Sequence, residues 1–221
     1  MDRETLVLSM VDKKSPGLAS GEVRAQVRTV EVREPYRNYF SIQEHDVAIP
    51  RFDGGFSDVV TRAVFVSGDA VCVLPYDPVR DRVMVIEQYR FGPHVRGDTQ
   101  PWKLEAIAGR IDPGETPEQT AMREMVEETG LHLRELIKAP SYYPAPGAVA
   151  EYMYSFIGLV DLPDDAAGIG GLEVEAEDIK SHILSFDGVM ELLNDGRADT
   201  GPLVVSLLWL AAHRESIRKG A

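Results

Sequence analysis

The sequence has little cysteine and no long apolar run. Cys72 is the single cysteine among 221 residues, which excludes an internal disulfide, and we expect it to be a buried, inert thiol. No apolar stretch approaches the ~20 residues that a membrane-spanning helix needs. Charged residues follow Met1 directly, with no long apolar core after them, so we expect no secretory signal peptide. These absences favour a cytoplasmic protein that does not bind membranes.

Positive charge is also scarce, with 23 Lys and Arg against 36 Asp and Glu and a formal net charge of −13. Such a balance argues against binding to nucleic acid or to anionic membranes. An anionic substrate would need metal ions and local arginines to supply the positive field. No Ser-His-Asp set and no phosphate-binding glycine loop is evident, and no metal-ligand spacing occurs among the histidines: His45, His94, His132, His182 and His213.

Helix signals surround residues 117–129. Thr116 can serve as N-cap, with Pro117 at the first helical position and Gln119 completing a capping box. Gly130 supplies the left-handed stop at the other end. The sequence therefore predicts a helix over 117–129.

The predicted helix has two contrasting faces. Three- and four-residue spacing predicts an apolar face made of Met122, Met125, Val126 and Thr129. The opposite face carries Glu124, Glu127 and Glu128, whose carboxylates repel one another unless a cation lies among them. A solvated acidic face is the simpler interpretation of most such helices. A hard divalent cation such as Mg²⁺ is the alternative, since it prefers carboxylate oxygens and bridges to substrate phosphates.

The residues around the helix favour the metal. The spacing of seven residues resembles the Nudix box: Gly109, Glu115, Arg123, the three glutamates and Gly130. The resemblance implies hydrolysis of a nucleoside diphosphate linked to another group, assisted by Mg²⁺, or Mn²⁺ in its place, with two or more ions per site. It implies Glu124 and Glu128 as primary metal ligands, Glu127 as an additional one, and Arg123 paired with Glu115. The backbone carbonyl of Ala108 is expected as a further ligand.

Segments flanking the box resemble the ADP-ribose pyrophosphatase branch of that family. They are residues 74–81, 87–90 and 101–109, together with Pro146 at the distance past the box where that branch carries a proline. The resemblance implies cleavage of ADP-ribose to AMP and ribose 5-phosphate. A hydrolase of another nucleoside diphosphate sugar, such as GDP-mannose, is the first alternative. A non-catalytic ADP-ribose-binding regulator is the second, although it would not need every box carboxylate.

The same resemblance suggests how substrate and water are held. Tyr39 resembles the aromatic that stacks on adenine, and the expected substrate-binding set is Tyr39, Arg62, Arg90, Glu105 and Pro146. A sheet-face aromatic and solvated surface arginines are the simpler interpretations of the first three. Glu175 matches the general base of the branch and Glu177 a metal ligand, with Glu151 as the alternative base. The segment 147–151 departs from the Gly-Gly-Thr-Ser-Glu of the branch, which weakens the expectation of strict preference for ADP-ribose.

The pattern of strands and helices predicts an α+β protein. By resemblance, residues 67–221 form a Nudix α/β/α sandwich with a mixed sheet. Alternation over 23–33, 39–49 and 57–66 predicts a small antiparallel sheet in an N-terminal domain, 1–66, of which residues 1–20 are expected to be poorly ordered. Residues 92–101 are expected to be loop, 104–108 a single strand, and 161–178 a long acidic loop. The resemblance further implies a homodimer that exchanges its N-terminal domains.

Overall fold

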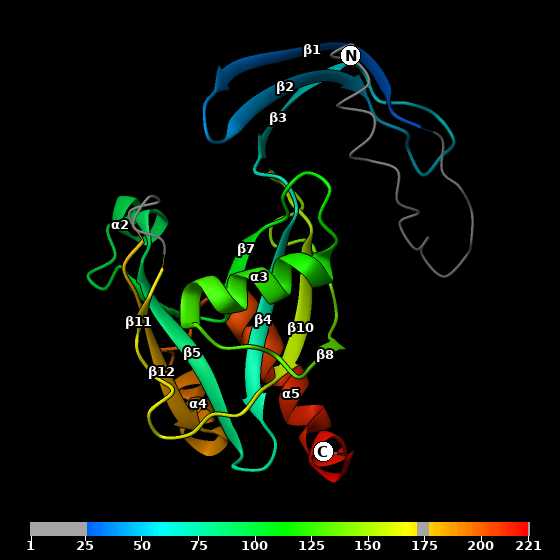
Figure 1. Cartoon of the computed structure of the whole chain (residues 1–221). Coiled ribbons are helices and arrows are strands. Elements are labelled where there is room, and N and C mark those ends of the chain that lie inside the picture. Colours follow the sequence, from blue (N-terminus) through cyan, green and yellow to red (C-terminus); the bar gives the residue numbers. More distant parts are fainter. Residues whose placement is uncertain (1–25, 172–176, 221) are drawn as a thin grey trace. The chain divides into compact units, whose positions relative to one another are not determined.

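The computed structural model describes residues 26–171 and 177–220 (Figure 1). The chain divides into two compact units. The smaller comprises Met1–Asn38 and Ile42–Val64, and the larger comprises Tyr39–Ser41 and Phe65–Ala221. The two units are described one at a time below.

The smaller unit is built on three strands, as the alternating pattern predicted: β1 (Arg28–Arg37), β2 (Ser41–Ala48) and β3 (Val60–Val66), hydrogen-bonded in that order. Arg33 of β1 bridges Glu44 and Asp46 of β2 at 3.4 and 2.6 Å. The last residues of β3, which belong to the larger unit, pair in parallel with β9 (Val149–Ala150). The ion pairs of Arg33 therefore link β1 to β2.

The larger unit is built on an eight-stranded mixed sheet, in which the order β11-β12-β5-β4-β10-β8 is joined by β6 on β5 and β7 on β4. Its strands are β4 (Ala70–Asp77), β5 (Arg82–Tyr89), β6 (Trp102–Glu105), β7 (Ile107–Arg110), β8 (Glu135–Lys138), β10 (Met153–Leu159), β11 (Ile169–Gly170) and β12 (Ile179–Ser185). The β4–β10 pairing is parallel, whereas the β4–β5 and β5–β12 pairings are antiparallel.

The sheet divides at its centre. β4 and β5 pair as a hairpin only near their turn, at Tyr76–Val83 and Asp77–Arg82. Beyond that point β6 pairs with β5 and β7 pairs with β4, so the two short strands fill the opening between them. The chain passes from one to the other at Ala106. This split brings Glu105 and Gly109 to the region where the helix of the box lies.

Helices cover both faces of the sheet (Figure 1). α3 (Pro117–Thr129) packs Ala121 and Met125 against Val71 and Val73 of β4 and against other strand residues. α4 (Phe186–Asn194) and α5 (Gly201–Gly220) pack on the opposite face, where Leu203, Leu207 and Leu210 meet Cys72 and Leu74. The fold is thus the α/β/α sandwich that was expected, with two separate cores. Cys72 is fully buried, as predicted.

Three local predictions were wrong. Residues 92–101 are not all loop, because α2 (Phe91–Arg96) forms one short helix before Gly97 ends it with φ of 87°. Residues 104–108 contribute to two strands instead of one, since the pairing partner changes at Ala106. The segment 161–178 contains β11, which pairs with β12. No helix in the described ranges is both long enough and apolar enough to span a bilayer.

Candidate active site

The box helix begins and ends as its sequence predicted. Thr116 accepts a hydrogen bond from the backbone N–H of Gln119, whose side chain accepts in return from the N–H of Thr116, forming the full capping box. Gly130 is left-handed at φ 70°. These caps fix the register of α3, and with it the direction in which each glutamate points.

The predicted apolar face of α3 was wrong in part. Met125 is fully buried, but Met122 and Val126 are 45% and 38% exposed. The buried side of the helix consists of Thr120, Ala121, Met125 and Glu128. Because an α-helix turns every 3.6 residues, positions 121, 125 and 128 share one face, so a glutamate occupies a core position.

Glu128 is the one glutamate of the box that is buried. Its side chain is buried, and its Oε2 has no hydrogen-bond partner among the described residues. Burial, followed by the nearby charges of Glu124 and Glu177, raises the pKa of Glu128 to about 9. A buried carboxylate oxygen without a partner costs free energy unless a ligand satisfies it.

Arg123 holds the remaining carboxylates of the box. Its guanidinium donates to Glu115 at 3.1 Å, to Glu124 at 2.8 Å and to Glu127 at 2.9 Å. The bond from Arg123, followed by a further one from Thr120, lowers the pKa of Glu115 to about 2. The expected pairing of Arg123 with Glu115 is present. The arginine also supplies positive charge to the two glutamates that were predicted to bind metal.

The glycine that opens the box makes room for Glu124. A Cβ at position 109 would clash with the carboxyl group and Cγ of Glu124. This carboxyl group therefore lies directly against the backbone of β7. The neighbouring residue in that strand, Ala108, pairs with Cys72 of β4. The contact places the carboxylate of Glu124 against the strand that contains Ala108.

Two strands of the split sheet add a charged pair. Arg90, at the end of β5, donates from Nε and Nη2 to Oε2 of Glu105, at the end of β6, at 2.8 and 2.5 Å. Burial by itself would lower the pKa of Arg90, but Glu105, with added effects from Glu128 and Glu177, raises it overall. Arg90 is therefore held as a cation beside the carboxylates.

The acidic loop approaches the far end of α3. A Cβ on Gly170 would clash with the backbone of Glu128, and the N–H of Gly171 donates to the carbonyl of Glu127 at 3.4 Å. Glu177, just before β12, acts electrostatically on Glu124, Glu128 and Arg90. The structure thus brings Glu177 to the box carboxylates. Glu175, the predicted base, lies outside the described residues.

Glu151 is surrounded by a different set of charges. Burial and the negative charge of Asp69 raise its pKa, while Arg110 opposes that shift. The guanidinium carbon of Arg110 lies 4.9 Å from the ring centroid of Tyr39, which groups with the larger unit and is 66% exposed. The sequence analysis did not single out Arg110, although it stands directly after Gly109.

The other predicted substrate residues are exposed. Arg62 lies on β3 in the smaller unit, where its Nη1 donates to the carbonyl of Thr61 at 3.2 Å. Pro146 is exposed in a turn closed by the N–H of Ala148 and the carbonyl of Ala145 at 3.0 Å. Neither is joined by the described contacts to the carboxylates of α3.

Oxygen donors dominate the site, which suits a hard divalent cation. Over residues 26–171 and 177–220, no group of three or more His, Cys, Asp or Glu side chains is already arranged to hold a metal ion. Arg123 accounts for part of this, since it engages Glu124 and Glu127. The unpartnered oxygen of Glu128 and the crowding of Glu124 and Glu177 around it still fit a cation.

Comparison with known proteins agrees with this geometry. The chain is 38% identical over 177 residues to ADP-ribose pyrophosphatase of Haemophilus influenzae (strain ATCC 51907 / DSM 11121 / KW20 / Rd), covering 79% of this chain and 81% of that protein. It is 31% identical over 175 residues to GDP-mannose pyrophosphatase of Escherichia coli (strain K12 / DH10B), covering 78% and 88%.

A solved structure shares the fold. The crystal structure of an ADP compounds hydrolase matches with a TM-score of 0.66 at 22% identity, covering 89% of this chain and 98% of that one. The NUDIX domain family matches residues 66–203, which include α3, its caps and the strands that surround it. The chain therefore belongs to the Nudix family.

Proposed function

We propose that the protein is an Mg²⁺-dependent pyrophosphatase that cleaves ADP-ribose to AMP and ribose 5-phosphate. The observation that carries the proposal is the convergence of Glu124, Glu128 and Glu177 beside the cation Arg90. Such a site combines ligands for a divalent ion with a group that binds phosphate. The relative from Haemophilus influenzae supports ADP-ribose as the substrate.

The proposed metal ligands are oxygen atoms of this chain's own residues. Glu124, Glu127, Glu128 and Glu177 and the carbonyl of Ala108 would hold Mg²⁺, or Mn²⁺, with two or more ions per site. Bound cations would neutralise the phosphate oxygens and polarise the phosphorus. The unpartnered Oε2 of Glu128 supports this set, because a buried carboxylate is best satisfied there by a cation.

The protein's own residues orient and deprotonate the attacking water. Arg90, fixed by Glu105, would hold a phosphate oxygen and so align the pyrophosphate. Glu175 would take the proton as water attacks phosphorus and the bridging P–O bond breaks, with Glu151 as the alternative base. The separate charge environment of Glu151, beside Asp69 and Arg110, supports Glu175.

We further propose that the protein acts in the cytoplasm as a homodimer that exchanges its N-terminal domains. In this dimer Tyr39 and Arg62 bind the adenine end of the substrate, and Pro146 shapes the adjoining turn. Within the smaller unit, one side of β1 exposes Val30, Val32 and Tyr36 at 67%, 51% and 54%. Apolar side chains exposed in a row on one strand favour burial by a partner surface.

GDP-mannose is the second candidate substrate. The relative from Escherichia coli favours it, at lower identity than the ADP-ribose pyrophosphatase. The departure of segment 147–151 from its expected sequence also loosens the case for ADP-ribose alone. Because the box performs the same reaction on either substrate, only the residues outside it distinguish them.

A substrate panel tests the proposal. Purified protein with Mg²⁺ is given ADP-ribose and GDP-mannose, and products are resolved by chromatography. We expect release of AMP and ribose 5-phosphate with a higher kcat/KM for ADP-ribose. A higher kcat/KM for GDP-mannose would reassign the substrate, and tight ADP-ribose binding without turnover would indicate a non-catalytic regulator.

A further inference from the structure

A cavity of about 350 Å³ opens at the β8 edge of the large sheet, beside the first turn of α3. Its lining includes Pro117 and Glu118 of α3, Lys138 of β8 and Tyr154 of β10. We call it the edge cavity. Its volume lies within the ~300–1,000 Å³ typical of small-molecule sites. The described residues that line it include none of the metal ligands or substrate residues proposed above, so it is a separate place in the larger unit.

A bulge in the strand pairing makes room for the edge cavity. The N–H of Ala139 donates to the carbonyl of Ser155 at 2.9 Å, and the N–H of Tyr142 donates to the carbonyl of Met153 at 3.0 Å. Three steps along one strand therefore face two steps along β10. Pro140 stands in this interval, where it has no N–H to donate. Bulges bend the strand and redirect its side chains, and they are common beside functional sites.

Tyr154 supplies an aromatic surface to the edge cavity. Alternation along β10 places it on the same face as Phe156, which packs in the core beneath α3. The ring centroid of Tyr154 lies 5.1 Å from that of Tyr152, which lies 4.8 Å from that of Tyr143, and both pairs meet edge to face. These neighbours restrict rotation of the Tyr154 ring. A planar ligand in the cavity therefore finds a fixed ring on which to stack.

Lys138 supplies positive charge at the rim of the same cavity. Its Nζ lies 2.9 Å from Oε1 of Glu118, and its side chain is 77% exposed. An ammonium group has three donors, so this ion pair leaves donors for a ligand. Because Glu118 offsets part of the charge, the rim suits a single phosphate better than a polyphosphate. The bulge adds Ser141, whose hydroxyl can both donate and accept.

The lining therefore combines a surface for a planar ring with a cation for one anionic group. We propose that the edge cavity is a second nucleotide site, which binds a nucleoside monophosphate with its base on Tyr154 and its phosphate at Lys138. Such a site adds to the proposed function a place where a nucleotide binds without being cleaved. The bound nucleotide contacts Pro117 and Glu118, in the first turn of the helix that carries the box.

Isothermal titration calorimetry with AMP tests the proposal. The α,β-methylene analogue of ADP-ribose, at saturating concentration with Mg²⁺, first fills the proposed active site. We expect AMP then to bind a further site on each chain. AMP should bind there about fivefold more tightly than adenosine, which lacks the phosphate. Inorganic phosphate alone is the third ligand, since a nucleotide site should bind it far more weakly than AMP.

Variants of the two ligand-binding side chains separate base from phosphate. Tyr154→Leu keeps an apolar side chain but removes the ring, so AMP affinity should fall about tenfold. Tyr154→Phe keeps the ring and should keep the affinity. Lys138→Ala should bind AMP and adenosine equally, because the fivefold difference depends on the ammonium group. Thermal unfolding of each variant checks its folding.

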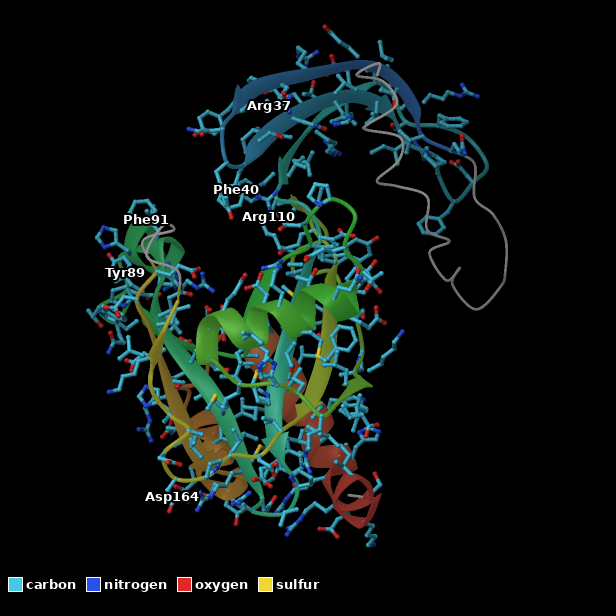
Figure 2. All side chains as sticks on the ribbon, viewed as in Figure 1. Arg37, Phe40, Tyr89, Phe91, Arg110 and Asp164 are labelled. Atoms are coloured by element: carbon cyan, nitrogen blue, oxygen red, sulfur yellow. The ribbon has the colours of Figure 1, made fainter. Side chains whose placement is uncertain are left out.

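Arg82→Ala is the control for Lys138→Ala, since it also breaks an ion pair of the larger unit. Arg82 and Asp164 are 2.5 Å apart, and Asp164 lies away from α3, at the end of the unit that holds the β4–β5 turn (Figure 2). AMP affinity in Arg82→Ala should stay within about twofold of wild type.

Three outcomes would overturn the second nucleotide site. They are absence of AMP binding beside the analogue, unchanged AMP affinity in both Tyr154→Leu and Lys138→Ala, and binding of inorganic phosphate as tight as that of AMP. Failure of the analogue itself to bind would count against the proposed function. The same variants titrated with AMP alone would then still decide whether the edge cavity binds a nucleotide.

Discussion

The carboxyl group of Glu124 packs against the backbone of Gly109, leaving no space there for a Cβ. Gly109→Ala should therefore displace the carboxylate from the site. We expect kcat/KM to fall about 100-fold, because small misplacements of catalytic groups are costly. Overpacking should also reduce the free energy of unfolding by about 1–3 kcal/mol. Steady-state kinetics and urea unfolding measure the two effects.

Gly92→Ala is the matched control, since nothing lies within 4 Å of a Cβ built there. Alanine at that position of α2 should leave kcat/KM within about twofold of wild type. Equal losses in the two variants would show that the effect at Gly109 does not come from Glu124.

Metal removal should destabilise the protein. A ligand that binds only the folded state stabilises it by about 2.7 kcal/mol at 100 times its Kd, so the wild-type Tm should rise with Mg²⁺ and fall again with EDTA. Glu128→Gln should lose both this shift and most activity. Its metal-free form should be at least as stable as wild type, because the variant no longer places an ionisable carboxyl group in the core. A full Mg²⁺-dependent shift in Glu128→Gln would contradict this role.

Arg90→Lys tests the two-bond contact with Glu105. Lysine keeps the charge but cannot donate two fixed bonds from one planar group to the same carboxylate oxygen. We expect kcat/KM for ADP-ribose to fall about 30-fold with little change in Tm, and Arg82→Lys, at the exposed pair with Asp164, to keep wild-type kinetics. Unchanged kcat/KM in Arg90→Lys would mean that Arg90 contributes charge alone.

The choice of base is settled by comparing two conservative variants. Glu175→Gln should keep Mg²⁺ binding but lower kcat by roughly 10²–10⁴-fold, the contribution typical of a general base. Glu151→Gln should retain kcat. Pre-steady-state kinetics with metal titration separates these effects. The reverse pattern would transfer the role to Glu151.

Asp77 should make stability depend on acid pH. Burial would raise its pKa, but hydrogen bonds from the backbone N–H groups of Arg80, Leu162 and Val79 and the Arg80 guanidinium lower it overall. Its contribution is therefore complete above the unfolded pKa of about 3.9 and is lost as pH falls through the lower folded value.

The test of this pH effect is Asp77→Asn. It should cost about 2 kcal/mol at pH 7, since the carboxylate accepts several bonds that an amide cannot replace. The difference from wild type should shrink as pH falls below about 4. Urea unfolding at pH 7 and pH 3 measures it, and a constant difference would exclude the carboxylate as the cause.

Much of the fold followed from local sequence. Thr116, Pro117 and Gly130 fixed α3, and alternation located β1, β2 and β3, because caps and pleats depend on neighbouring residues. The division of 104–108 into two strands could not be predicted. It depends on where β4 and β5 diverge, which is a property of pairing between distant segments.

The site was predictable as a set of residue types but not as an arrangement. The motif placed glutamates on one helix, but it did not show that Glu128 would be buried with Met125 while Met122 stayed exposed. Burial depends on which side the sheet presents to α3. The ion pair between Lys103 and Asp199 could not be predicted either, because its residues come from segments that meet only in the folded protein.

The position of Glu177 has a consequence for folding. It stands just before β12, which joins β5 across a large separation in sequence, at Ile179–Gln88. Contacts of this kind form slowly because loop closure must come first. We therefore expect the box helix to form early and the carboxylate of Glu177 to arrive late, where the charges of Glu124 and Glu128 are already in place. We expect refolding to be faster when a divalent cation reduces the repulsion between Glu177 and the carboxylates of α3.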